Sequence, residues 1–211
     1  MNLNDLNQLI EAKRQEITEW MEKKRAEVPI PIYGSVDVRD AGWKIAVVDA
    51  NHFPAGFNNV APEDEQHLSA LLKNHINRRD EKCRWVHLYP ESHTRNAAYV
   101  ENLKTLQRLI EQAGFRCTVG SPELADHGSL AGISGPLNLD IVSLQMVNDE
   151  ESIVVNGEQP DLILLNNDLT EGIVPGLGTS RVSPPPVMGW HSRKKSHHYD
   201  ALSDMLVKLP N

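Results

Sequence analysis

The chain has 211 residues, of which 40% are hydrophobic and 24% are charged, and its formal net charge at pH 7 is -8. This composition predicts a folded core and excludes a chain that is disordered throughout. The acidic balance excludes a general nucleic-acid-binding surface, because such a surface needs many Lys and Arg side chains to neutralise phosphates.

An amphipathic pattern comes first along the chain. Six apolar residues recur there at helical spacing, namely Leu3, Leu6, Ile10, Ile17, Trp20 and Met21. We therefore expect an N-terminal amphipathic helix in residues 1–30, followed by an α/β domain in residues 31–211. The helix should pack against its own domain. It could alternatively support a homo-oligomer, although so short a partial heptad pattern is not a sustained coiled coil.

Features of export and membrane insertion are missing from the sequence. No run of 18 apolar residues occurs, and the first residues lack the basic-then-apolar order of a signal peptide. Cys83 and Cys117 are the only cysteines, and they lack the CxxC spacing of a thiolate zinc site. We expect a cytoplasmic protein with buried, reduced thiols and no membrane contact.

Apolar strand patterns alternate with helical patterns through the first half of the chain. The predicted strands are 43–50, 84–90 and 115–120. One helix should follow Pro62, and a second should be capped by Thr94 and closed by Gly114. This βαβαβ order predicts a three-layer, Rossmann-like (pre-ATP-grasp-like) α/β domain with a mainly parallel sheet.

The second half of the chain is less regular. Residues 121–138 are expected to form a loop, and two further strands at 139–147 and 152–157 should flank a turn. Residues 161–168 restore the character of a buried strand. A Gly- and Pro-rich connection, "PGLGTSRVSPPP", follows this strand.

Polar residues follow three of the predicted core strands. They include Asp49 and Asn59 after the first strand, Arg95 after the second, and Asn167 and Asp168 after the strand at 161–168. The carboxyl ends of parallel strands share one edge of the sheet, where open α/β folds bind ligands. The competing interpretation is that these residues make turns and helix caps. It explains Arg95 less well, because a cation at a helix start opposes the macrodipole unless an anion lies nearby.

The stretch "GWHSRKKSHHYD", residues 189–200, gathers basic side chains in an acidic protein. Ser196 is a candidate N-cap for a helix carrying Tyr199, Leu202, Leu206 and Leu209. Basic side chains ahead of a helix start suit a carboxylate or phosphate. A solvated basic loop ranks second, and a metal site ranks third because the adjacent lysines would repel a cation.

Four stretches resemble the motifs of the proteobacterial GshA-type glutamate-cysteine ligases, a family similar to ATP-grasp enzymes. They are "SVDVRDAGWKIAVVDANHFPAGFNNV", "ESHTRN", "LLNNDL" and "GWHSRKKSHHYD". The resemblance implies the N-terminal, substrate-side half of an enzyme that joins the γ-carboxylate of glutamate to the amine of cysteine, a step in glutathione biosynthesis. It also implies ATP and Mg²⁺, at a site outside this chain.

The resemblance and the charges together suggest roles for individual residues. Cations could bind the carboxylates or phosphate of an anionic amino-acid substrate, with His191 beside them: Arg39, Lys44, Arg95, Arg193 and Lys194. Polar residues could hold the substrate ammonium group or orient those cations: Asp49, Asn59, Asn167 and Asp168. No protein nucleophile is required, so no catalytic residue is assigned.

Two other functions stay open at this point. A nucleotide- or anion-binding α/β module is one, although "PGLG" is only a fragment of a phosphate-binding fingerprint. A non-catalytic interaction protein built on the N-terminal helix is the other. If the ligase interpretation holds, this chain alone is expected to be inactive.

Overall fold

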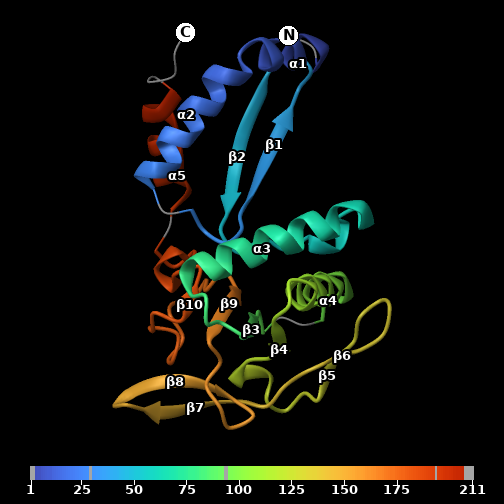
Figure 1. The fold of residues 1–211 in the computed structure, drawn as a ribbon, viewed down its shortest axis with the longest axis vertical. Helices are drawn as coiled ribbons and strands as arrows, with labels where there is room; N and C mark the ends of the chain where they lie inside the picture. The colour runs from blue at the N-terminus through green and yellow to red at the C-terminus, as the bar shows by residue number, and fades with distance from the viewer. Residues whose placement is uncertain (1–2, 29, 93–94, 193, 207–211) are drawn as a thin grey trace.

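The computed structural model describes residues 3–28, 30–92, 95–192 and 194–206. At its centre lies a four-stranded sheet in the order β10-β9-β3-β4 (Figure 1). Every neighbouring pair in this sheet is parallel. The strands are β3 (Trp85–Pro90), β4 (Arg116–Val119), β9 (Leu162–Asn166) and β10 (Val182–Ser183). The predicted parallel sheet is confirmed.

Two helices cover one face of the sheet, α3 (Glu65–Arg79) and α4 (Ala97–Gln112). The face of α4 that meets the sheet is fully buried at Val100, Leu103, Leu106, Leu109 and Ile110. This spacing is what places apolar side chains on one side of a helix. Gly114 follows the helix with φ = 96° and closes it as predicted, because an L side chain rarely adopts that backbone conformation.

The opposite face of the sheet is covered by β structure and a loop rather than by helices. The antiparallel pair β7 (Val142–Val147) and β8 (Glu150–Val155) packs there through Val142, Ile153 and Val155. The two strands predicted around residues 148–151 are therefore confirmed. The described residues form no helical layer on this face, as a Rossmann-like, three-layer arrangement would require, so that part of the fold prediction is not confirmed.

The first predicted strand exists, but its place in the sheet was predicted wrongly. β2 (Ile45–Asn51) pairs antiparallel with β1 (Ser35–Asp40) in a separate two-stranded hairpin. The connecting turn is closed by the hydrogen bond from the Ala41 N–H to the Lys44 carbonyl, with Gly42 at φ = 79°. A nearby antiparallel partner needs only a short turn, whereas the expected parallel pairing needs a long crossover. β2 therefore pairs with its neighbour β1 and not with the parallel sheet.

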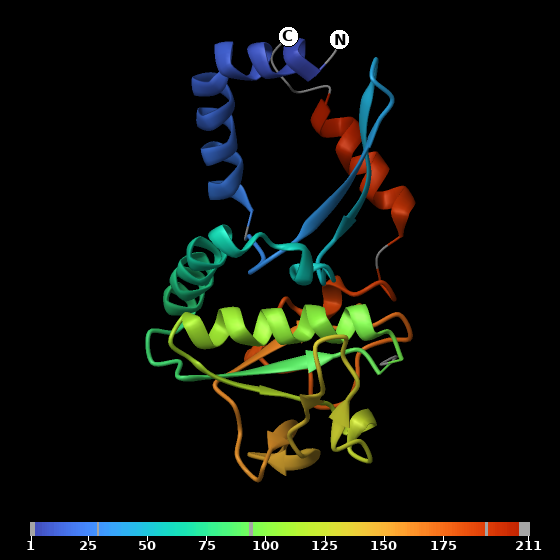
Figure 2. The same cartoon turned by 90° about the vertical axis from the view of Figure 1, so that its right-hand side faces the viewer.

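The N-terminal helical region consists of two helices, α1 (Leu3–Ala12) and α2 (Arg14–Glu27), which meet at Lys13. Figure 2 shows them running in different directions at one end of the molecule. No described side chain of α2 is buried. The expectation that this region packs against its own domain therefore does not hold for α2.

The last helix, α5 (Lys195–Leu206), begins one residue before Ser196, which is therefore inside the helix and not its N-cap. The N-cap of α4 is Asn96, whose side chain accepts hydrogen bonds from the N–H groups of Ala98 and Tyr99. The predicted cap Thr94 and the apolar Leu209 lie outside the described residues. Within the described part of the chain, no helix is long and apolar enough to span a bilayer.

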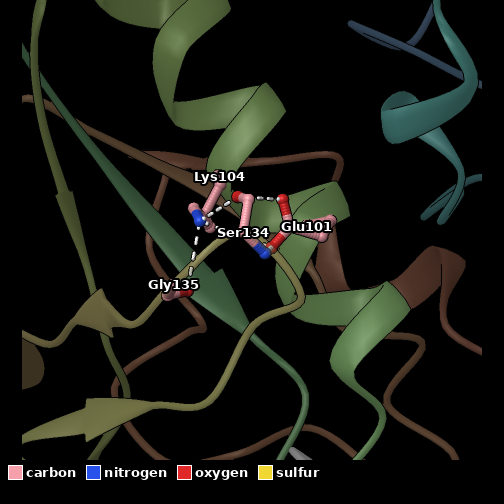
Figure 3. Close-up of polar contacts among 4 residues, drawn as sticks. All are labelled: Glu101, Lys104, Ser134 and Gly135. Carbon is pink, nitrogen blue, oxygen red and sulfur yellow. Dashed lines mark hydrogen bonds and ion pairs between the residues drawn. The ribbon is translucent and has the colours of Figure 1, made fainter.

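Short elements complete the chain. They are η1 (Phe57–Asn59), η2 (Pro62–Asp64), η3 (Pro122–Leu124), η4 (Pro186–Met188), and the paired strands β5 (Ser129–Leu130) and β6 (Leu137–Asn138). The loop between β5 and β6 is attached to α4 through Glu101 (Figure 3). Its carboxylate accepts hydrogen bonds from the Ser134 N–H (2.8 Å) and hydroxyl (2.7 Å). Lys104 donates to Glu101 (3.3 Å) and to the Gly135 carbonyl (3.1 Å).

Candidate functional site

The carboxyl ends of β3 and β9 are joined to α4 by hydrogen bonds. The Tyr99 hydroxyl donates to the Asn166 carbonyl (2.8 Å) and accepts from the Glu91 N–H (2.9 Å). The Asn167 side chain donates to the Pro90 carbonyl (3.1 Å). Burial raises the pKa of Tyr99, so its hydroxyl keeps its proton and donates at any physiological pH. These contacts fix the edge of the sheet where ligands are expected.

A buried amide pair carries the segment after β2 to the same edge. Asn102 accepts from the N–H groups of Gly56 (2.8 Å) and Phe57 (2.9 Å) and donates to Asn166 (3.0 Å). Asn166 in turn donates to the Pro54 carbonyl (2.8 Å). Both amides are fully buried, and a buried amide is stable only when its donors and acceptors are paired. The pair therefore positions residues 54–57 beside β9.

The basic stretch docks on the residues that follow β9. The Trp190 N–H donates to the Asp168 carbonyl (2.8 Å), and Nδ1 of His191 donates to the Leu169 carbonyl (3.1 Å). A Cβ at Gly189 would lie 2.9 Å from both His191 Nδ1 and Leu169 Cβ, so this close approach requires glycine. Two stretches far apart in the sequence are thus packed together by backbone contacts.

Helix α5 connects the basic stretch to the hairpin. Lys195 forms an ion pair with Asp49 (Nζ to Oδ2, 3.2 Å), and its ammonium lies 5.6 Å from the centre of the Trp190 ring. The Tyr199 hydroxyl donates to the Val48 carbonyl (2.6 Å). The Lys195 side chain is 59% exposed, so this surface ion pair contributes little to stability and serves mainly to orient α5.

Two open pockets meet at Glu91. The first, which we name the acidic pocket, lies beyond the ends of β3 and β9, and none of its described lining residues is Lys, Arg or His. It is lined by Glu91, Ser92, Glu123, Asn167, Asp168, Leu169, Thr170, Glu171, Gly172 and Val174. The Tyr89 hydroxyl donates to both carboxylate oxygens of Glu123, and Thr170 donates to Asp168 (2.6 Å). The electrostatics of this pocket favour a cationic group such as an ammonium.

The second, which we name the amide pocket, lies at the N-terminus of α4. It is lined by Ala55, Gly56, Asn58, Asn59, Glu91, Asn96, Ala98, Tyr99 and Asn102. The Asn58 and Asn59 side chains and the positive end of the helix dipole suit an anionic group, whereas Glu91, which this pocket shares with the acidic pocket, suits a cation. The two pockets side by side therefore offer complementary surroundings for a zwitterion.

The predicted site residues divide into two sets. Asn59, Asn167 and Asp168 line the two pockets, the exposed Arg95 adjoins Asn96, and His191 contacts the segment after Asp168. The remaining described residues lie elsewhere: Asp49 on β2 paired with Lys195, Arg39 on β1, Lys44 at the hairpin turn, and Lys194 exposed just before α5. Arg193 lies outside the described residues.

Several residues at these pockets were not singled out from the sequence. Glu123 lies in η3 and Glu171 in a loop after β9, and no local pattern predicts that the two come close together. Asn102 could have been found from the sequence. It lies on the apolar side of a predicted helix, the side that also carries Tyr99, Leu103 and Leu106. A polar residue in such a stripe indicates a buried hydrogen-bonding role. Among the described residues, no group of three or more His, Cys, Asp or Glu side chains could hold a metal ion.

Comparisons with known proteins identify the family of this chain. The GshA family, described as glutamate-cysteine ligase, matches residues 7–210. A crystal structure of a candidate γ-glutamylcysteine synthetase from Methylobacillus flagellatus KT is similar, with 30% sequence identity and a TM-score of 0.82. The match covers 97% of this chain and 48% of that one, so the chain spans about half the length of this relative. No curated protein matches. Because the family match extends over nearly the whole sequence, the chain belongs to the GshA glutamate-cysteine ligase family.

Proposed function

We propose that this chain is the substrate-side part of a glutamate-cysteine ligase, an ATP-dependent enzyme that forms γ-glutamylcysteine. The observation that carries the proposal is the convergence of all four ligase-like stretches. The first reaches the carboxyl edge through residues 54–59, the second through Glu91, the third through residues 166–168, and the fourth through His191. The family match favours this function over a nucleotide-binding module or a non-catalytic interaction protein.

The paired pockets support binding of an amino acid by opposite charges. We assign the substrate ammonium group to the acidic pocket, near Asp168 and Glu171. A substrate carboxylate would then lie toward the amide pocket, near Asn59, Arg95 and the N-terminus of α4. In this arrangement the protein contributes by holding and orienting charged groups rather than by supplying a nucleophile.

ATP and Mg²⁺ belong to the proposal through the family. They would activate the γ-carboxylate of glutamate as an acyl phosphate, which the cysteine amine attacks with release of phosphate. We place the nucleotide and the metal in the half of the enzyme that the Methylobacillus relative has beyond this match. The free, buried thiols of Cys83 and Cys117 fit the cytoplasmic location that we propose, where thiols stay reduced.

Calorimetric titrations with two ligands test the charge assignment. L-glutamate carries an ammonium group, and glutarate has the same two carboxylates without it. Glu171→Gln should weaken L-glutamate binding about tenfold and leave glutarate binding unchanged, because only the first ligand has a cation for the acidic pocket. Arg95→Gln should weaken binding of both ligands.

Glu81→Gln is the matched control, because Glu81 is also an exposed glutamate but precedes β3 at the opposite edge of the sheet. This variant should bind both ligands as the wild type does. Equal effects of Glu171→Gln and Glu81→Gln, or the same loss for both ligands in Glu171→Gln, would contradict the assignment.

A further inference from the structure

Several elements extend from one end of the sheet core with apolar side chains still exposed to solvent. They are the helices α1 and α2, the hairpin β1-β2, and α5 (Figure 2). On the hairpin, Val36 is 54% exposed, Val38 55% and Ile45 42%, and Trp43 at the turn is 75% exposed. On the N-terminal helices, Ile17 and Met21 are also exposed. So many large apolar side chains at one end of a molecule mark an interaction surface.

The strand register places three of these hairpin residues on one face. Val36 lies opposite Ala50, Val38 opposite Val47, and Asp40 opposite Ile45. Alternate residues of a strand share a face, and so do residues directly opposite one another. Val36, Val38 and Ile45 therefore share one face with Asp40, and we name the surface formed by these four residues the hairpin face.

The other face of the hairpin is already occupied. Asp49 lies opposite Asp37 in the register, and its side chain pairs with Lys195 of α5. A second tether joins α5 to β2 between Tyr199 and the Val48 carbonyl. An isolated two-stranded hairpin is marginally stable in water, and packing of a further element against its apolar side provides the missing stability. The hairpin face is therefore the side left for a partner.

The solved relative indicates the partner. Its match covers 97% of this chain, and the unmatched 3% is too short to contain the hairpin. The hairpin therefore belongs to the part that this chain shares with the Methylobacillus protein. More than half of that polypeptide lies outside the match. We infer that the hairpin face docks this remaining half of the ligase, which aligns the ATP-binding part with the substrate pockets.

A second copy of the chain fits the surface less well. Each chain has a formal net charge of -8, so two copies repel one another. Figure 2 also shows the N-terminal helices, the hairpin and α5 leaving the core at different places. A symmetric dimer would bury a single self-complementary patch from each copy.

Mixing separately purified halves tests the inference. The probe is the part of the Methylobacillus flagellatus protein outside the match, and binding to residues 1–211 is measured by sedimentation and calorimetry. We expect a one-to-one complex that Ile45→Asp weakens at least about tenfold. Val38→Ala, a milder change that keeps the hairpin apolar, should weaken the complex to a smaller extent.

Ile141→Asp is the control, because Ile141 is 74% exposed and lies just before β7 at the other end of the molecule. It should leave the affinity within about twofold. An absent complex, equal effects of Ile45→Asp and Ile141→Asp, or self-association of residues 1–211 that Ile45→Asp abolishes would overturn the inference. The measurement needs no substrate, so a complex that forms without ligating would count against the proposed function and not against the docking surface.

Discussion

At the scale of single residues, His87 is held neutral in the middle of β3. Its side chain is fully buried, Nε2 donates to the Gly120 carbonyl (3.0 Å), and Nδ1 accepts from the Thr118 hydroxyl (2.9 Å). That hydroxyl accepts in turn from the Trp85 indole (2.8 Å). Burial lowers the pKa of His87 to about 4, because the charged imidazolium would lose its hydration.

This pKa predicts a loss of stability in mild acid. The folded pKa lies below the ordinary value of 6.5, so the unfolded chain binds a proton first as the pH falls. The contribution of neutral His87 to the free energy of unfolding is complete above pH 6.5. It is lost as the pH falls toward 4, and the loss amounts to roughly 3 kcal/mol. A nitrogen-15 NMR titration should show His87 neutral down to about pH 4 in the folded protein and titrating near 6.5 in urea. Titration near 6.5 in the folded state would contradict this account.

Asn102 supports a second prediction at this scale. Asn102→Leu keeps a similar volume but leaves the Gly56 and Phe57 N–H groups and the Asn166 side chain without their partner. The expected loss is roughly 3 kcal/mol of unfolding free energy, because each buried group left unpaired costs about 1–3 kcal/mol. Urea unfolding measures it, with Asn138→Leu as an exposed control on β6 that should change little. Equal stabilities of the two variants would show that the buried amide pair is not needed.

At the scale of secondary-structure elements, the loop between β5 and β6 is held on α4 by the Glu101 carboxylate together with the Lys104 ammonium group (Figure 3). The hydrogen bond from the Ser134 N–H, followed by that from its hydroxyl, lowers the pKa of Glu101 below the usual 4.5. The part of the attachment that Glu101 provides is therefore complete above pH 4.5 and is lost as the pH falls through the lower folded pKa.

The Ser134 amide resonance should report this transition at a pH below 4.5, with a lower midpoint than that of a free glutamate. Glu101→Gln should remove the transition and increase hydrogen exchange at Ser134 and Gly135. Glu111→Gln, an exposed substitution on the same helix, is the control and should preserve both signals. If the Ser134 resonance were unaffected by Glu101→Gln, the attachment of the loop would have to lie elsewhere.

Strands and helices with strong local patterns were predictable, and long-range pairings were not. The buried strand β9, the end of α4 at Gly114 and the turn between β7 and β8 all follow from local residue types. The placement of β2 did not, because a β-branched run looks the same in a hairpin as in a parallel sheet. The acidic pocket also escaped prediction, since its carboxylates come from loops after β3, β4 and β9 that meet only in the folded chain.

At the scale of the whole molecule, the protein combines a packed core with a hairpin, β1-β2, and a helix, α2, that are only partly packed. The parallel sheet, α3 and α4 share a continuous apolar core. The hairpin and α2, by contrast, leave apolar side chains exposed. The acidic pocket and the amide pocket lie at the edge of the core sheet, so the proposed function predicts that substrate binding and ligation are separable.

The most direct test of the central claim is therefore a ligation assay. ADP release is followed in a coupled assay with glutamate, cysteine, ATP and Mg²⁺. The assay is run first with residues 1–211 alone and then after adding the part of the Methylobacillus flagellatus protein that lies outside the match. We predict no turnover above the protein-free control for residues 1–211, and γ-glutamylcysteine formation when both halves are present. Turnover by residues 1–211 alone, or no γ-glutamylcysteine from the two halves together, would contradict the account.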